Sequence, residues 1–299
     1  MISRLGQKLY SNAYLLLSLT ALFWAGNFVL GRGVHEHVPP IALAWTRWCL
    51  ATLIILPFAI PHLKRDWPVI RASMPLLLFL GIVGVGAFNT LSYTGLNYTT
   101  ALNGLVLQSS GPILIVLVSF LIFGDRISPR QAFGISVSLT GVLVMVARGD
   151  PDVLAGFELN RGDLLLIAAL VLWGLYTAYL RKRPAIHWLS FTAVTFFIGA
   201  IVNTPFFVWE HLSVRQLQLD TQTIAAIAYV SIFPSVLAYI CFNRGVELIG
   251  ANRAGVCLHL VPLFGAVLAI TLLGEEPRTY HYIGIALILT GVTMAARKG

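Results

Sequence analysis

Residues 101–142 read ALNGLVLQSSGPILIVLVSFLIFGDRISPRQAFGISVSLTGV, and residues 251–292 read ANRAGVCLHLVPLFGAVLAITLLGEEPRTYHYIGIALILTGV. Each stretch begins with alanine, has valine at its sixth position and proline at its twelfth, and ends on Leu-Thr-Gly-Val. In both, a glycine is followed by an acid, at 124–125 and at 274–275. Hydrophobic segments align easily by chance, but a proline, a glycine and an acid in one register do not. The sequence therefore contains an internal repeat with an offset of 150 residues, which divides the chain into residues 1–150 and 151–299.

The composition around this repeat is that of a membrane protein. The chain has 299 residues, of which 58% are hydrophobic and 11% charged, and its mean hydropathy is +0.83. Soluble domains carry about 25% charged residues, so this chain has too little polar surface to cover a water-soluble particle. The net charge of +8 does not require a nucleic-acid partner, because membrane proteins retain Lys and Arg in their cytoplasmic loops.

Ten stretches are apolar and long enough to span a bilayer as helices. They are roughly 13–31, 41–60, 74–96, 101–123, 131–147, 163–180, 187–208, 222–243, 252–273 and 280–296. Breaks are expected at Pro39-Pro40, at residues 64–68 and at residues 125–129. A transmembrane β-barrel would show shorter, alternating segments. The predicted fold class is an all-α integral membrane protein with ten transmembrane helices.

The distribution of the twenty Lys and Arg residues predicts the orientation. With the N-terminus in the cytoplasm, fourteen fall on the cytoplasmic side, five fall on the other side, and Arg47 lies within a span. This bias predicts that both termini are cytoplasmic.

Five spans in each half have a topological consequence. Because five is odd, the second half must enter the membrane from the opposite side, which gives an inverted-topology repeat. Two similar halves of this kind can open a shared central site first to one face of the membrane and then to the other. The architecture favours a transporter, although a channel or a membrane enzyme could also adopt it.

Several motifs together resemble a known family. They are W-x-x-N at Trp24–Asn27, the A-x-x-x-x-V-x-x-x-x-x-P segment at Ala101–Pro112, Gly124-Asp125, Leu139–Val142, and their counterparts in the second half. In this combination the chain resembles the EamA type of the drug/metabolite transporter superfamily over nearly its whole length, and within that family it looks most like YddG-type exporters of aromatic and other amino acids. The resemblance implies export of amino acids and related metabolites across the bacterial inner membrane. The implied partners are small-molecule substrates and the lipid bilayer; no cofactor, metal, nucleic acid or obligatory protein partner is predicted.

Polar and aromatic residues within the spans indicate where a substrate would bind, since polar side chains in a bilayer face protein or a wet cavity. Trp24 and Asn27 share one helix face, and Trp173 and Tyr176 repeat their spacing in the sixth span. Positions 89 and 93 hold Asn and Tyr, whereas positions 239 and 243 hold Tyr and Asn. The predicted substrate-binding residues are Trp24, Asn27, Tyr93, Gln108, Trp173, Tyr176, Tyr239, Asn243 and His259.

Each of these residue types also has a purely structural interpretation. Trp and Tyr anchor helices at the membrane interface, and Asn, Gln, Ser and His hydrogen-bond neighbouring helices. Pro112 and Pro262 bend their helices, and the bends are either hinges or only a matter of shape. Glycines in the spans, including Gly134, Gly141 and Gly291, are expected to let helices approach closely.

The twelve carboxylates bear on energy coupling. All of them are expected in loops or at helix ends, whereas ion-coupled carriers usually keep an ionisable residue within the membrane. His259 could carry a proton, or it could simply join two helices. We therefore expect facilitated efflux without obligatory proton coupling. The alternative, a proton-coupled multidrug or organic-cation exporter, is disfavoured by the lack of a membrane glutamate. No catalytic motif such as H-E-x-x-H or G-x-S-x-G is found, so no enzyme is predicted.

Arg47 is the unusual residue of the second span. Arginine at the bilayer centre costs about 2.5–3.5 kcal/mol on insertion scales. Its side chain could snorkel to the outer surface or serve the structure, which is the favoured interpretation. It could instead face the interior and hold a substrate carboxylate through its planar guanidinium.

Overall fold

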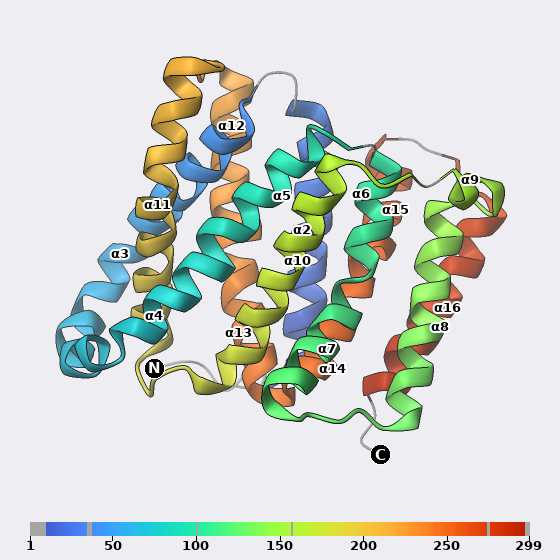
Figure 1. Ribbon diagram of the computed structural model, residues 1–299, viewed down its shortest axis with the longest axis horizontal. Helices are drawn as coiled ribbons and strands as arrows, with labels where there is room; N and C mark the ends of the chain where they lie inside the picture. The colour runs from blue at the N-terminus through green and yellow to red at the C-terminus, as the bar shows by residue number, and fades with distance from the viewer. Residues whose placement is uncertain (1–9, 35–37, 100, 157, 274–275, 297–299) are drawn as a thin grey trace.

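The computed structural model describes residues 10–34, 38–99, 101–156, 158–273 and 276–296. Throughout these residues the regular structure is helical (Figure 1). For residues 28–34, 101–102 and 272–273 the description covers the backbone alone.

The first half contains α2 (Ala13–Val34), α3 (Pro40–Ala72), α4 (Met74–Gly81), the π-helical segment η1 (Ile82–Ala87), α5 (Phe88–Leu96), α6 (Ala101–Ser109), α7 (Gly111–Phe123) and α8 (Pro129–Val146). After the short α9 (Asp152–Ala155), the second half contains α10 (Arg161–Tyr179), η2 (Leu180–Lys182), α11 (Trp188–Ser213), α12 (Thr221–Ser231), the π-helical segment η3 (Ile232–Leu237), α13 (Ala238–Ile249), α14 (Ala251–Val256), η4 (Cys257–His259), α15 (Leu260–Leu273) and α16 (Thr279–Ala296).

A helix lies at each of the ten predicted positions. Among the described residues, eight continuous helices are long and apolar enough to cross a membrane, and α6 with α7 forms a ninth candidate that is bent by 41°. The remaining predicted span corresponds to α2, whose described apolar part is Ala13–Asn27. The helices are consistent with ten spans, and the predicted all-α class is confirmed.

One predicted break is wrong. The residues 64–68 were expected to form a loop, but α3 continues through them for 33 residues and contains Pro57, Pro61 and Pro68. The extension is held by Asp66, which is 8% exposed and accepts hydrogen bonds from the His187 backbone N–H (2.8 Å) and the Ser190 hydroxyl (2.8 Å) at the start of α11. Tertiary contact thus overrides the local signal of charge and proline. Asp66 accordingly lies within a helix and not in a loop.

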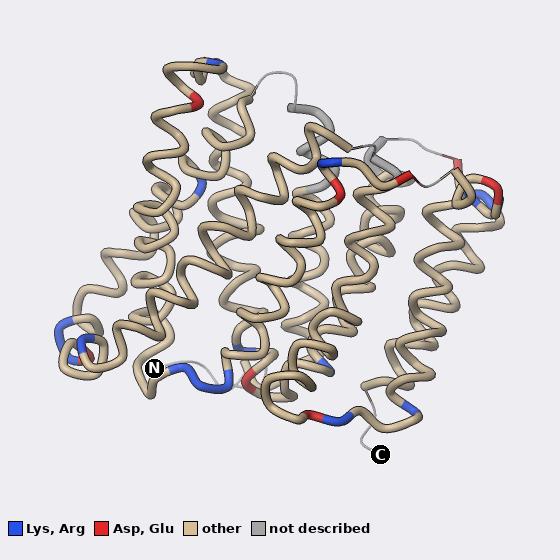
Figure 2. Tube along the Cα trace, in the orientation of Figure 1, with Lys and Arg blue, Asp and Glu red and all other residues tan. Residues whose placement is uncertain are grey.

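The two described ends of the chain meet at one end of the helix bundle. The Tyr14 hydroxyl at the start of α2 donates a hydrogen bond to the Ala296 carbonyl at the end of α16 (2.7 Å). We call this the terminal end and the opposite one the distal end. Helices α2 and α10, which occupy corresponding places in the two halves, run in opposite directions between them (Figure 1). Figure 2 shows that most of the Lys and Arg segments lie at the terminal end.

The two π-helical segments interrupt corresponding helices of the two halves. η1 covers residues 82–87 and η3 covers residues 232–237, so they lie 150 residues apart. Pro234 in η3 has no N–H to donate to the Val230 carbonyl, and the Ser235 hydroxyl donates to that carbonyl instead (2.6 Å). Such π-bulges are frequent at functional sites.

Helices α8 and α16 pack against each other at one edge of the molecule (Figure 1). Their contact depends on glycine. A Cβ added to Gly141 would lie 2.8 Å from the Gly284 carbonyl oxygen, and one added to Gly291 would lie 2.4 Å from the Ser138 backbone nitrogen. The predicted role of these glycines in close helix approach is confirmed.

Candidate functional site

Five aromatic side chains from three helices meet at the centre of the bundle. We call them the aromatic cluster: Trp24 on α2, Trp173 and Tyr176 on α10, and Tyr239 and Phe242 on α13. The Trp24 and Trp173 rings meet edge to face with centroids 5.3 Å apart, and Tyr239 lies 5.7 Å from Trp173 in the same kind of contact. All members except the half-buried Trp24 are at most 2% exposed. The rings therefore fill the space between the two halves.

Small residues make room for these rings. A Cβ at Gly84 in η1 would lie 2.0 Å from the Tyr176 ring, so only glycine allows this tyrosine to lie against the π-helical segment. The Tyr239 hydroxyl donates to the Gly84 carbonyl (2.7 Å). In this way η1 packs directly on the aromatic cluster.

The Trp24 indole and the two tyrosine hydroxyls of the cluster are hydrogen-bonded. The Trp24 Nε1–H donates to the Pro234 carbonyl in η3 (3.0 Å), and the Tyr176 hydroxyl donates to Asn243 Oδ1 (2.8 Å). Burying such groups is costly unless they are paired. The centre combines a large apolar surface with a few fixed hydrogen-bonding groups.

The structure brings together most, but not all, of the predicted substrate-binding residues. Trp24, Trp173, Tyr176 and Tyr239 belong to the cluster. Asn243 accepts a hydrogen bond from Tyr176, and Tyr93 accepts one from Arg47, which is linked to the cluster through Pro234. Asn27 and Gln108 are half-buried and share no hydrogen bond with another described residue of the site.

His259 lies outside the aromatic cluster. Its Nδ1 lies 2.6 Å from the Ser138 hydroxyl of α8, and its Nε2 lies 3.0 Å from the Ser109 carbonyl of α6. These contacts fit the alternative interpretation of this residue as a link between helices.

The two prolines proposed as hinges follow irregular segments. Pro112 lies in the first turn of α7, directly after the break at Ser110 where α6 and α7 bend by 41°. Pro262 lies in the first turn of α15, which follows the 3-10 segment η4.

Arg47 does not snorkel. It is 2% exposed and its side chain reaches from α3 to α5 and η3. The guanidinium donates to Asn89 Oδ1 (3.1 Å), the Tyr93 hydroxyl (2.7 Å), the Ser235 hydroxyl (2.5 Å) and the Pro234 carbonyl (3.0 Å). The snorkelling interpretation is therefore wrong: the donors of Arg47 find their partners within the protein and not at the surface.

Sequence reasoning missed four aromatic residues of the central region. Phe242 belongs to the cluster, and Phe88 packs on Trp173 with a centroid distance of 4.8 Å. Trp48 and Phe196 pack on Tyr239 with centroid distances of 5.2 and 5.6 Å. A phenylalanine in an apolar span can face lipid as well as protein, so its residue type does not indicate whether it lies in the central region. Trp48 directly follows Arg47 in the sequence, and this neighbouring arginine is the one sequence feature that could have indicated a position inside the protein.

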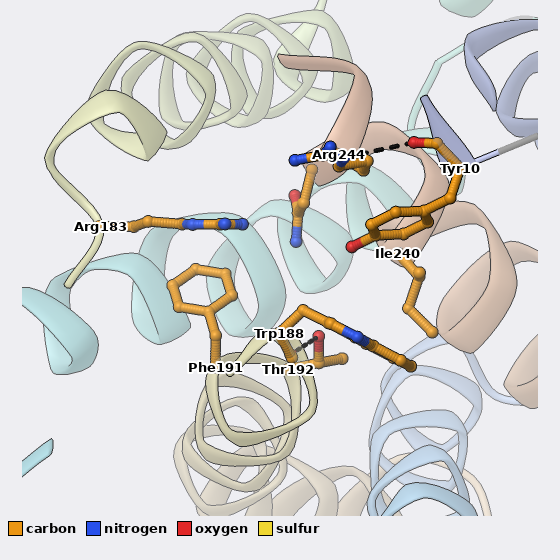
Figure 3. Close-up of a pocket in the computed structure, with 8 residues that line it drawn as sticks. Tyr10, Arg183, Trp188, Phe191, Thr192, Ile240 and Arg244 are labelled. Carbon is orange, nitrogen blue, oxygen red and sulfur yellow. Dashed lines mark hydrogen bonds between the residues drawn. The ribbon is translucent and has the colours of Figure 1, made fainter. Parts of the chain in front are cut away.

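At the terminal end, ion pairs close the bundle. Glu247 on α13 binds both Arg183 (2.9 Å) and Arg244 (2.8 Å). Arg244 also lies over the ring of Tyr10, and burial raises the pKa of that tyrosine despite the nearby guanidinium. Figure 3 shows Arg183 above the Phe191 ring, beside a pocket of about 10 Å³, which is room for roughly one water molecule. The pocket is lined by Tyr10, Arg183, Trp188, Phe191, Thr192, Ile240, Asn243 and Arg244.

At the distal end, a buried carboxylate closes the bundle. Asp163, in the first turn of α10, accepts hydrogen bonds from the Thr99 hydroxyl (2.5 Å) and the Asn103 side chain (2.8 Å). It also accepts from the Asn160 backbone N–H (2.9 Å) in a capping box. Helix α10 is thereby tied to the segment that joins α5 and α6.

Comparison with known proteins identifies the family. The sequence profile of the EamA-like transporter family matches residues 11–147 and residues 160–297. The chain belongs to this family. The two matched stretches together cover most of the chain and correspond to its two halves.

Full-length relatives of this EamA-like transporter carry transporter names. It is 27% identical to "Uncharacterized transporter YyaM" of Bacillus subtilis, over 95% of this chain and 93% of the relative. It is 29% identical to an uncharacterized transporter of Archaeoglobus fulgidus, over 96% of this chain and 98% of the relative. A protein of Salmonella typhimurium named "Probable amino-acid metabolite efflux pump" is 26% identical, over 92% of this chain and 91% of the relative.

A solved crystal structure shows the same fold. The two chains superpose with a TM-score of 0.78, covering 95% of this chain and 96% of the other, at 20% sequence identity. This chain is a multi-pass membrane transporter with the fold of the EamA-like family.

Proposed function

We propose that the protein exports amino acids, aromatic ones among them, and related metabolites across the bacterial inner membrane by alternating access. The observation that carries this proposal is the aromatic cluster, in which Trp24 and Trp173 from corresponding helices meet at the centre. An aromatic, nearly uncharged site suits a small zwitterion with a sizeable apolar side chain. The name of the Salmonella typhimurium relative points to the same class of solute.

The two halves, residues 1–150 and 151–299, act in this proposal as inverted repeats. The opposite directions of α2 and α10 (Figure 1) and the π-helical segments at an offset of 150 support it. Both termini would face the cytoplasm, because Lys and Arg gather at the terminal end.

The contacts at the two ends suggest how access alternates. Opening to the terminal end requires separation of Glu247 from Arg183 and Arg244, whereas opening to the distal end requires separation of Asp163 from Thr99 and Asn103. Both sets of contacts are formed in this structure and the aromatic rings fill the centre. In this proposal the structure is a closed state, and release of either set of contacts opens the site to one side.

The proposed transport needs no coupled ion. The described carboxylates Asp66, Asp163 and Glu210 accept hydrogen bonds that join helices, and Glu247 on α13 pairs with two arginines. None of them belongs to the aromatic cluster. The solute gradient alone would then drive efflux.

Counterflow in liposomes tests the function. Vesicles containing the purified protein are preloaded with unlabelled phenylalanine, tryptophan, threonine or methionine, and entry of the labelled compound is followed. We expect counterflow of amino acids and at least a ten-fold higher half-saturating concentration in Trp24→Ala and Trp173→Ala, since losing about 1.4 kcal/mol of binding free energy weakens affinity ten-fold. Trp209→Ala serves as the matched control, because Trp209 is 57% exposed and its loss leaves the centre intact.

Other outcomes would contradict the proposal. Counterflow of ethidium but of no amino acid would indicate an organic-cation exporter. Accumulation of amino acids driven by an imposed pH gradient would show proton coupling, whereas equal steady-state levels with and without the gradient are expected.

A further inference from the structure

The charge of Arg47 has no acidic partner. Arginine stays protonated in proteins, and this side chain is 2% exposed. Its four hydrogen-bond partners, Asn89, Tyr93, Ser235 and the Pro234 carbonyl, are all neutral. Among the described residues no carboxylate lies within ion-pair distance of it. Buried charges in proteins are normally paired, so Arg47 departs from the rule.

Other buried charges in the same protein are compensated in a way that Arg47 is not. Asp163 lies in the first turn of α10, and Glu210 accepts hydrogen bonds from the first backbone N–H groups of α3. Helix N-termini carry partial positive charge and stabilise carboxylates there. Arg47 is the eighth residue of α3, in the N-terminal half of that helix. The helix dipole therefore gives its positive charge no compensation.

Arg47 is directly linked to the aromatic cluster. The Pro234 carbonyl in η3 accepts hydrogen bonds from both Arg47 Nη2 and Trp24 Nε1, each at 3.0 Å. On the other side, Asn89 accepts from Arg47 and donates to the Tyr239 hydroxyl (3.4 Å). The Arg47 guanidinium and the Trp24 indole thus share one acceptor. A small solute whose side chain contacts the rings would therefore place its polar end near the guanidinium.

Of the two repeat halves, only the first has a cationic residue at this position. Depending on whether the offset is 149 or 150, the counterpart of Arg47 is Phe196 or Phe197. One cation beside an aromatic site matches a solute with one carboxylate and one apolar side chain. It does not match phosphate esters, whose charge needs several cations.

We propose that Arg47 binds the carboxylate of the transported solute and makes the carrier specific for carboxylate-bearing compounds. The assignment rests on the proposed function, which it deepens by naming the residue that recognises this group. The carboxylate replaces neutral acceptors such as the half-buried Tyr93 hydroxyl and forms a bidentate pair with the planar guanidinium. Because Arg47 bonds both Pro234 and Ser235, this exchange also loosens the contact between α3 and η3.

Competition by phenylalanine analogues that keep or lack the carboxylate tests the assignment. Labelled phenylalanine counterflow is measured in the presence of phenylalanine, phenylpropionate, phenylalaninamide or phenethylamine. In the wild-type protein the first two are expected to compete at least ten-fold better than the last two, as a charge-assisted hydrogen bond implies. Arg47→Gln should bring this ratio close to one, and Arg47→Lys should give an intermediate ratio.

Two further measurements keep the test decisive. Arg65→Gln is the matched control, because Arg65 is exposed and pairs at the surface with Asp66, and it should retain the wild-type ratio. Tyr93→Phe removes one neutral acceptor from Arg47 and should raise the preference for carboxylates; this result is informative even where Arg47→Gln fails to fold.

The outcomes separate the two proposals. Equal competition by phenylalanine and its amide in the wild-type protein would overturn the assignment of Arg47 while leaving amino-acid transport intact. A folded Arg47→Gln variant with the wild-type ratio would overturn it as well. Absence of counterflow for every amino acid in folded wild-type protein would overturn both proposals.

Discussion

The contact between α8 and α16 allows a quantitative test of how this fold is held together. A Cβ introduced by Gly291→Ala would lie 2.4 Å from the Ser138 backbone nitrogen and 2.5 Å from the Gly134 carbonyl oxygen. Optimal contacts between non-bonded atoms lie at about 3.5–4.0 Å, so the helices would have to separate by about 1 Å. The neighbouring atoms belong to the backbone of α8 and cannot rotate away as a side chain does.

The expected cost follows from this displacement. A gap of about 0.5–1 Å forfeits a quarter to a half of the dispersion energy of the separated atoms, and overpacking of this kind typically costs about 1–3 kcal/mol. Gly265→Ala is the matched control, because Gly265 lies within α15 and a Cβ there would meet no atom within 4 Å. In that helix interior alanine is favoured over glycine by about 0.5–1 kcal/mol.

The assay is heat inactivation of the detergent-solubilised protein, followed by size-exclusion chromatography of the surviving folded fraction. We expect the midpoint temperature to fall in the order Gly265→Ala, wild type, Gly291→Ala. The two variants should differ by about 1.5–4 kcal/mol when both effects are combined. A midpoint for Gly291→Ala at or above that of Gly265→Ala would refute the close-packing argument.

Three further predictions concern the helix ends. Glu210→Gln should destabilise the protein by about 1–2 kcal/mol in the same assay, because the carboxylate caps α3 through the N–H groups of Ile41 (3.1 Å) and Ala42 (2.7 Å); an unchanged midpoint would contradict the capping role. Burial, together with repulsion from His62 and Arg65, lowers the pKa of His187 in the folded protein. As the pH decreases, the unfolded chain is therefore protonated at this histidine at a higher pH than the folded chain. The free energy of unfolding should accordingly fall as the pH drops below about 6.5. This pH dependence, measured as melting midpoints between pH 8 and pH 5.5, should weaken in His187→Asn, which retains a capping side chain, and an equal slope would exclude His187 as its source. Glu247→Gln removes the ion pairs with Arg183 and Arg244. In a background without native cysteines, it should speed maleimide labelling of Thr192→Cys by about two- to five-fold, as about 0.5–1 kcal/mol for partly exposed ion pairs implies. Unchanged labelling would show that these pairs do not close the terminal end.

The repeat in the sequence predicted which parts of the fold would meet. Trp24 and Trp173 were predicted from their matching positions to bind substrate; their rings are in contact, and the binding role itself stays a prediction. The glycine motifs of the fifth and tenth spans were predicted to allow close approach, and α8 and α16 touch through them. Both contacts depend on residue type and register, which the sequence states directly.

Other features depend on contacts that no local pattern contains. The length of α3 is set by Asp66 binding the start of α11, more than a hundred residues away in the chain. The side chain of Arg47 points into the protein because its acceptors lie on α5 and η3. The energetic cost of inserting an arginine into a bilayer does not indicate which way the side chain points. The π-helical segments are changes in backbone hydrogen bonding, for which Pro234 and Gly84 are at most weak indications. Sequence therefore located the central residues better than it described their surroundings.

The hydrogen bonds between counterpart residues show why a repeat can locate a centre. Asn89 donates to Tyr239, and His259 bonds the carbonyl of Ser109; in both pairs the residues lie 150 apart in the chain. In a structure with two similar, oppositely oriented halves, a residue can touch its own counterpart only close to the axis that relates them. Matching positions with polar or aromatic side chains are thus the first candidates for a shared site. A departure from the match, such as Arg47 opposite a phenylalanine, gives the two halves different chemistry, and our proposal assigns carboxylate recognition to that difference.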